Sequence, residues 1–406
     1  MQISNRLELM EHVKENIINK TYDSGVILKK DLDEIVDSFW YKDGMLKNED
    51  LYHIDLKDFS IFHDYLIKKV IAIHEGEISN ENAEILKKGT CFNISLEEIN
   101  DAKSAYKIYT FNESYEYVFI GDLHSDDQSL KRALQSIEFY EKVVSNQKIR
   151  LVFTGDYVDR GHVHLKLMER VLLLKYLFPE YIFLLRGNHD GGILEGNGSL
   201  ILPYRIPEED TKEMYFPHYL KTLGLKNKSF KSTLLERYLN LFNSLSYIAA
   251  IKNGSQIVLA VHGGIPRPKY ENSKFYKHLN VLSDLTDQSI VDHMGINICQ
   301  NIMWSDPHKG DKDLREQSGR FQFTKEHFNE FKERFGFDIL IRGHESAADG
   351  FRYHFDECLI TVFSTGGMYE SNDKLGDKEE LNSESGYLEI NPKVLSISYD
   401  GMLTFL

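Results

Sequence analysis

Aspartate, histidine and asparagine residues recur at the ends of five short apolar runs in this 406-residue sequence. The runs are YVFIGDLH, RLVFTGDYVDRG, YIFLLRGNHD, IVLAVHGG and FDILIRGHE. Their polar residues are Asp122, His124, Asp156, Asp159, Arg160, Asn188, His189, Asp190, His262 and His344. Carboxylate, amide and imidazole groups suit manganese, iron or zinc. Two carboxylates and an arginine between positions 156 and 160 would be costly at the end of a buried strand unless ions bind them.

The spacing of these residues indicates a pair of divalent metal ions. Asp122 and His124 are separated by one residue, so a strand end and the following turn can aim both at one ion. Asp156 has two carboxylate oxygens and can bridge two ions. Two ions about 3.5–4 Å apart polarise a phosphoryl oxygen and lower the pKa of a bound water from about 15.7 to about 7. Arg160 would then face an incoming phosphate, which predicts phosphoester hydrolysis.

The elements that must position these residues follow an α/β pattern. The five apolar runs are predicted strands, and SLKRALQSIEFYEKVV and VHLKLMERVLLLKYL, between the first three, are predicted helices. Runs that are apolar on both faces are typical of central strands, and ligands of such sheets bind at the carboxyl ends of the strands. Near the C-terminus, FRYHF, CLITVFSTGG, GYLEI and VLSISYD alternate as antiparallel strands do. Residues 203–250 are interpreted as a helical insertion beside the cleft.

Residues 1–112 have a different pattern. Apolar residues such as Leu7, Met10 and Val13 recur every three to four positions, which predicts amphipathic helices without a chemical motif. We expect residues 1–112 to form a helical accessory region that packs on the catalytic domain or recruits a protein partner. Residues 113–406 would then form the catalytic domain.

Composition and charge exclude several classes of protein. Hydrophobic residues make up 42% of the chain and aromatic residues 12%, which is enough for a full core. The net charge of −15 argues against a general nucleic-acid binder and against binding to an anionic membrane. Cys91, Cys299 and Cys358 form no CxxC pair, and no leader or 18-residue apolar run is found. We therefore expect reduced thiols and a cytoplasmic location, with delivery to another compartment or a host cell left open.

The motifs GD-L-H, GDYVDRG, RGNHD, HGG and RGH resemble, in this order, those of the PPP-type metallophosphoesterases. These are the calcineurin-like serine/threonine protein phosphatases. The resemblance extends over roughly residues 115–370, and GDYVDRG is its most specific element. The content of lysine, asparagine and isoleucine suggests a microbial member. The resemblance implies an α/β fold with a central β-sheet sandwich flanked by helices, here with a mainly helical N-terminal region.

The resemblance also implies a role for each residue that matches a motif. Asp122, His124 and Asp156 would hold one divalent ion, and Asp156, Asn188, His262 and His344 would hold the other. Manganese is expected, with iron or zinc as alternatives. Arg160, Asn188 and Arg320 would bind the substrate phosphate, with Arg315 as the alternative to Arg320. His189 would protonate the leaving oxygen, oriented by Asp159, whose charge is expected to raise the pKa of the imidazole.

The implied reaction is hydrolysis of phosphoserine and phosphothreonine in proteins by direct attack of a dimetal-bound hydroxide. Three positions depart from the family pattern: Ser125 replaces a glycine, Asp190 replaces a glutamate, and STGGMY, with Tyr369, replaces the family's tyrosine loop. The changed loop leaves phosphotyrosine open as a substrate. A dinucleoside-polyphosphate or other small-molecule phosphoesterase is the alternative. An inactive phosphatase-fold scaffold is disfavoured because all six ligand positions are filled.

Overall fold

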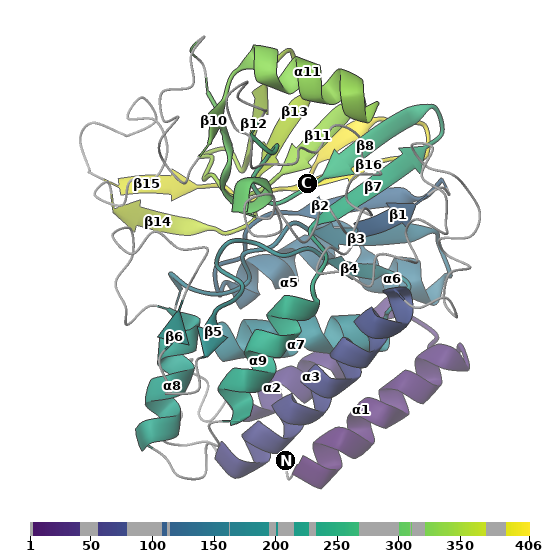
Figure 1. The fold of residues 1–406 in the computed structure, drawn as a ribbon. Helices are drawn as coiled ribbons and strands as arrows, with labels where there is room; N and C mark the ends of the chain where they lie inside the picture. Colours follow the sequence, from purple (N-terminus) through teal and green to yellow (C-terminus); the bar gives the residue numbers. More distant parts are fainter. Residues whose placement is uncertain are drawn as a thin grey trace.

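Two mixed β-sheets lie face to face in the computed structural model, with helices on the outer face of each sheet (Figure 1). The structure describes residues 3–40, 56–78, 108–111, 114–161, 163–194, 200–201, 215–226, 233–267, 300–308, 310, 321–370 and 387–406. This arrangement confirms the predicted α/β sandwich with a helical N-terminal region.

The first sheet contains five strands, and the last three in its spatial order are parallel to one another. In spatial order the strands are β17 (Leu403–Phe405), β16 (Val394–Ile397), β2 (Glu116–Ile120), β3 (Ile149–Phe153) and β4 (Ile182–Leu184). The strands β2, β3 and β4 are the first three apolar runs of the sequence. Their carboxyl ends therefore lie at one edge of the sheet, as the α/β pattern predicts.

The second sheet contains six strands. In spatial order they are β1 (Ile108–Phe111), β7 (Ile248–Asn253), β8 (Gln256–Ala260), β11 (Ile339–Arg342), β13 (Leu359–Val362) and β12 (Phe351–His354). The strands β8 and β11 are the other two predicted runs, and they pair in parallel. Three two-stranded pairs are β5 (Ile193–Leu194) with β6 (Leu200–Ile201), β9 (Asp306–Pro307) with β10 (Gln322–Phe323), and β14 (Gly367–Glu370) with β15 (Tyr387–Ile390).

Side-chain alternation along the strands builds the separate layers of the core. On β2, Tyr117 and Phe119 pack between the two sheets, whereas Val118 and Ile120 face the helices. The second sheet packs its outer face against α11 (Lys325–Phe335). Thr324 caps this helix with a reciprocal pair of contacts to His327, and Gly336 ends it with a φ of 69°.

Helices of the central part of the chain lie on the outer side of the first sheet (Figure 1). Next to the strands are α5 (Asp127–Ser136), α6 (Phe139–Val144) and α7 (His164–Leu177), and farther from the strands α8 (Phe216–Lys226) and α9 (Thr233–Ser244) pack against each other. The last two belong to the predicted insertion at 203–250, the rest of which lies largely outside the described residues. Within the described ranges, none of the helices combines the length and the hydropathy that a membrane span needs.

The N-terminal helices α1 (Ile3–Ile18), α2 (Gly25–Trp40) and α3 (Leu56–Ile78) pack on α7 and α9 (Figure 1). Their buried apolar residues, such as Met10, Leu32 and Phe62, belong to the same core as Leu172 of α7 and Val118 of β2. The helices therefore share a core with the sheet that carries the motifs. The domain boundary near residue 112 and the recruitment of a partner by these helices stay predictions.

A buried ionic cluster joins these helices to α7. Arg6 of α1 forms an ion pair with Glu169 of α7 and donates hydrogen bonds of 3.0 and 2.7 Å to the carbonyl oxygen of Ile35. His63 of α3 contacts the other oxygen of Glu169 through Nε2 at 2.9 Å and the hydroxyl of Tyr238 in α9 through Nδ1 at 2.6 Å. Residues of five helices thus take part in this cluster.

Candidate metal centre

The five strand ends bring the predicted ligands together. Asp122 follows β2, Asp156 follows β3, Asn188 follows β4, His262 follows β8 and His344 follows β11. Asp156 lies at the centre, because its Oδ2 is 3.7 Å from His124 Nε2 and 3.2 Å from His262 Nε2. Residues more than 200 positions apart in the sequence thus meet between the two sheets.

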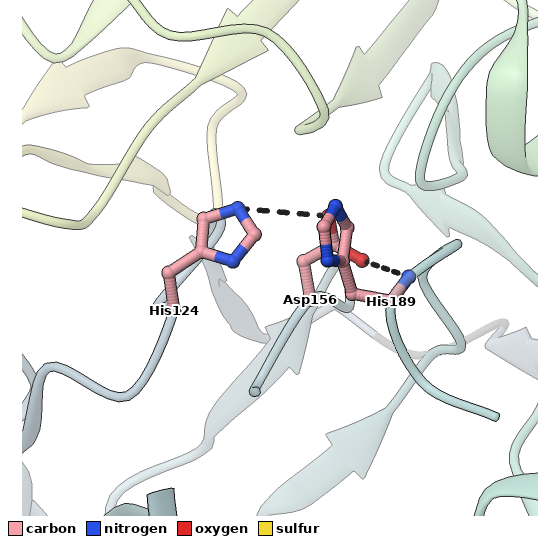
Figure 2. A group of neighbouring side chains, drawn as sticks. All are labelled: His124, Asp156 and His189. Atoms are coloured by element: carbon pink, nitrogen blue, oxygen red, sulfur yellow. Dashed lines mark hydrogen bonds and ion pairs between the residues drawn. The ribbon is translucent and has the colours of Figure 1, made fainter. Parts of the chain in front are cut away.

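Two groups of donor atoms share Asp156. His124, Asp156 and His189 form one group, and Asp156, His262 and His344 form the other, each with its ligand atoms within 4.8 Å of one another. Figure 2 shows the first group, with an ion-pair contact between His124 and Asp156 and a hydrogen bond from the backbone N–H of His189 to Asp156, 2.9 Å long. A carboxylate common to two groups is what a bridging ligand requires.

The orientation of His124 fits a metal ligand. Its Nδ1 lies 3.0 Å from the carbonyl oxygen of Val158, which can only accept, so Nδ1 carries the proton. Its Nε2 then points a lone pair at Asp122 Oδ2, 3.6 Å away, and at Asp156 Oδ2. Among the described residues, Asp122 Oδ2 and His124 Nε2 are buried and have no hydrogen-bond partner. A cation between these atoms would satisfy all of them.

His262 repeats this arrangement on the other side of Asp156. Its Nδ1 lies 3.0 Å from the carbonyl oxygen of Thr154, and its Nε2 lies 2.8 Å from Asn188 Oδ1 and 3.2 Å from Asp156 Oδ2. Two oxygens facing one ring nitrogen need a cation, either a proton or a metal ion. Metal-bound histidines commonly donate their other N–H to a backbone carbonyl, as both His124 and His262 do here.

Two glycines leave space for the carboxylates. A Cβ atom at Gly187 would lie 2.1 Å from Asp156 Oδ1, and one at Gly343 would lie 2.3 Å from Asp122 Oδ1. Any larger residue would push these ligands out of place. The glycines of RGNHD and RGH are therefore required by the site itself.

Buried charges shift the pKa values around Asp156. Burial alone would raise the pKa of Asp156, but the charges of His262 and His189 outweigh it and hold that pKa well below its ordinary value. Burial and repulsion from Asp156 raise the pKa of Asp190 to about 7. Asp190 nevertheless accepts hydrogen bonds from the backbone N–H groups of Asp156, Tyr157 and Gly187. Asp190 therefore fixes two of the site's loops.

His189 is held on both sides. Its Nδ1 contacts Asp159 Oδ2 at 2.8 Å, which places the proton on Nδ1, and its Nε2 lies 3.4 Å from Nη2 of Arg160. Burial holds the pKa of His189 well below its ordinary value and outweighs Asp156, which acts in the opposite direction. The expected increase in this pKa is wrong, because the sequence does not reveal how deeply the ring is buried.

The backbone of the site is strained. Six non-glycine residues here have positive φ angles between 39° and 74°. They are His124, Ser125, Asp156, Asp159, Arg160 and His344. Each such residue costs about 1–3 kcal/mol and persists only where its surroundings hold it, which is typical of functional sites.

Arg342 is a residue of the site that the motif search passed over. It is fully buried, and its Nη2 forms an ion pair with Asp306 Oδ1 at 2.9 Å. Asp306 Oδ1 lies 3.6 Å from His344 Nε2, and the ring of Trp304 meets that of His344 edge-on, with centroids 5.3 Å apart. Arg342 thus orients the segment Trp304–Pro307 against His344. Its place in the RGH motif was the available signal.

Some predicted residues cannot be placed. Arg320 and its alternative Arg315 lie outside the described residues, as does the side chain of Tyr369. The other predicted residues, namely Asp122, His124, Asp156, Asp159, Arg160, Asn188, His189, His262 and His344, all fall in the same site.

The part of the chain that carries this site matches a known protein family. Residues 116–347, more than half of the chain, match the family model of calcineurin-like phosphoesterases. The chain belongs to this family. It is therefore related to phosphoesterases, a class of hydrolases, as the motifs predict.

Similar proteins carry the names of serine/threonine phosphatases. The chain is 24% identical over 314 residues to a probable serine/threonine-protein phosphatase of Encephalitozoon cuniculi, covering 76% of this chain and 58% of that protein. It is 28% identical over 247 residues to the serine/threonine-protein phosphatase 4 catalytic subunit of Candida glabrata, covering 60% of this chain and 67% of that protein. The predicted relationship to this group is confirmed.

A solved structure confirms the fold. It is a protein serine/threonine phosphatase from Saccharomyces cerevisiae with similarity to human phosphatase PP5. The TM-score is 0.55 at 16% identity, and the match covers 91% of this chain and 88% of that chain. The coverage extends beyond the residues matched by the family model.

Proposed function

We propose that this protein is a metal-dependent protein phosphatase that hydrolyses phosphoserine and phosphothreonine monoesters. The observation that carries the proposal is that two groups of buried metal-ligand atoms share the carboxylate of Asp156. The names of the relatives support a phosphoprotein as the substrate.

The proposal assigns two divalent ions to the site. Asp122, His124 and Asp156 would hold one ion, and Asp156, Asn188, His262 and His344 would hold the other. The oxygen and imidazole donors suit manganese, iron or zinc, and we propose manganese. Such ions supply Lewis-acid activation of phosphate and of water.

The remaining residues would bind phosphate and move a proton. Arg160 presents a guanidinium group next to His189, a geometry that suits two phosphate oxygens. Arg320 is proposed as the second phosphate ligand, and Asn188 as a third. Asp159 fixes the proton of His189 on Nδ1, so Nε2 is the atom that would exchange a proton with the leaving oxygen. A bound phosphate dianion would raise the pKa of His189 and so favour the protonated ring that a general acid needs.

The test is hydrolysis of a substrate panel by the full chain with added Mn²⁺, with and without a chelator. The panel contains phosphoserine, phosphothreonine and phosphotyrosine peptides and diadenosine tetraphosphate. We expect chelator-sensitive hydrolysis of the first two peptides and about two bound ions per chain by elemental analysis. Hydrolysis of the dinucleotide alone would overturn the assignment to phosphoproteins.

Two variants test the metal site. Asp156→Asn is expected to lose bound ions and at least about 10³-fold in rate, because it removes the shared carboxylate charge. Asp356→Asn is the matched control, since Asp356 is an exposed carboxylate that also has a positive φ, of 56°. It should behave as the wild type. An active Asp156→Asn variant with two bound ions would contradict the bridging role.

A further inference from the structure

A buried imidazole lies behind the Asp159–His189 pair. His164 is the first residue of α7 and only 4% exposed. Its Nδ1 lies 3.1 Å from the backbone nitrogen of Asp159 and 2.7 Å from the hydroxyl oxygen of Ser125. A backbone N–H can only donate, so Nδ1 accepts and carries no proton. The hydroxyl of Ser125 also lies 3.4 Å from the carbonyl oxygen of Asp159, and over the shorter distance it donates to Nδ1 of His164.

We propose that His164 is a positioning residue for the phosphatase reaction: it fixes the backbone of Asp159, and through Asp159 the direction of His189. The inference rests on the proposed function. The hydrogen bonds described for His164 reach Ser125 and Asp159, not a candidate metal ligand, so its proposed role is exerted through these residues.

Both residues that hydrogen-bond to His164 have an unfavourable backbone conformation. Ser125 and Asp159 have φ angles of 69° and 72°, a conformation that is unfavourable for residues other than glycine. They belong to the loops that follow β2 and β3. These loops also touch at Gly161, where a Cβ atom would lie 2.3 Å from the carbonyl oxygen of His124. One ring nitrogen therefore joins the loop of the first metal group to the loop of the phosphate-binding arginine.

A displacement of the Asp159 backbone would disturb two hydrogen bonds of its carboxylate. Its Oδ2 contacts His189 Nδ1 at 2.8 Å, and its Oδ1 accepts the backbone N–H of Phe216 at 2.6 Å. The ring of Phe216 also packs near that of His164, with centroids 5.7 Å apart, and Tyr219 lies at 5.5 Å. His164, Asp159 and the start of α8 thus form one packed unit behind His189.

The side chain of Ser125 provides a hydrogen bond to His164. It stands where the family pattern implied by the motifs has a glycine, and a glycine would relieve the positive φ. Serine adds a hydroxyl group, and that hydroxyl bonds to His164. The serine at position 125 and the buried His164 are therefore partners in one hydrogen bond.

Three variants test which ring atom matters. In His164→Asn the amide oxygen can take the place of Nδ1 and accept both hydrogen bonds. In His164→Gln the amide extends toward the position of Nε2, so the two variants are matched in polarity and differ in reach. We expect His164→Gln and His164→Ala to lower kcat about 10- to 100-fold with KM within about threefold, as a misdirected catalytic group does. His164→Asn should stay within about threefold of the wild-type kcat.

Three further measurements exclude a merely structural role. Bound ions should stay near two per chain in every variant, and a loss of ions would place the role of His164 at the metal site and overturn the proposal. Ser125→Gly combined with His164→Ala should be no slower than His164→Ala alone. In the wild type, ¹⁵N NMR should find Nδ1 of His164 without a proton.

The outcomes separate this proposal from the proposed function. Failure of the proposed function is visible in the wild type, as absent hydrolysis of the phosphopeptides. With an active wild type, equal kcat values for the Asn, Gln and Ala variants would overturn the role of His164. A protonated Nδ1 would overturn it even if His164→Ala failed to fold.

Discussion

Replacement of Arg6 by methionine is expected to destabilise the whole molecule. The side chains of Arg6 and Glu169 are both 0% exposed, so the change leaves a carboxylate in the core without its cation. The remaining partner of Glu169 is His63, and burial lowers the pKa of His63, so this ring is neutral at pH 7. Removal of one member of a buried ion pair costs about 3–5 kcal/mol.

The assay is urea unfolding of the full chain, followed by far-UV circular dichroism. Lys29→Met is the matched control, because Lys29 pairs with Asp33 at 2.8 Å on the same helical region with 38% and 20% of the two side chains exposed. Exposed pairs of this kind contribute about 0–1 kcal/mol. The double variant Arg6→Met, Glu169→Met removes both charges and should recover most of the lost stability.

Two results would refute this reasoning. One is an Arg6→Met variant whose free energy of unfolding lies within about 1 kcal/mol of the wild-type value. The loss of its cation would then cost the buried carboxylate of Glu169 little. The other is a double variant as unstable as Arg6→Met, which would mean that lost packing, and not the unpaired charge, causes the destabilisation.

Three other predictions concern the site and the pH dependence of stability. Gly187→Ala should abolish ion binding in elemental analysis, because its Cβ would lie 2.1 Å from Asp156 Oδ1, whereas Gly254→Ala, which meets no atom within 4 Å, should keep both ions. Arg160→Lys should raise the KM for a phosphopeptide about tenfold in steady-state assays, because lysine keeps the charge and loses the two-point contact. Burial lowers the pKa of folded His63, so the unfolded chain binds a proton first as pH falls below about 6.5. The urea midpoint should therefore decrease between pH 7 and pH 5, and less so in His63→Gln.

The sequence was sufficient to predict the strands and most of the site. Each motif follows an apolar run, and the parallel strands β2, β3 and β4 carry their polar ends to one edge, so the convergence of Asp122, Asp156 and Asn188 follows from topology. His262 and His344 reach them from the second sheet, and this depends on how the two sheets pack. The pKa of His189 could not be predicted, because it depends on a burial that arises only from packing of distant segments.

Packing of the N-terminal helices on the catalytic domain was one of the two expected roles, but the ionic contacts through which they pack could not be predicted. All 14 residues of α7 are buried, although it contains Lys166, Glu169, Arg170 and Lys175, which by composition would mark a solvent-facing surface. These charges instead meet partners on α1 to α3, such as Arg6, or on α5. No local pattern predicts which of many charged residues will pair across 163 positions.

The enclosure of α7 has a consequence for how this chain can be divided. A polypeptide that began near residue 113 would leave Glu169 and Lys175 without the ion partners Arg6 and Glu77 and would expose a broad apolar surface to water. We expect such a fragment to self-associate, and its catalytic loop to loosen, because the same helix begins with His164. The point where the motifs begin is therefore not a point where the folded molecule can be cut.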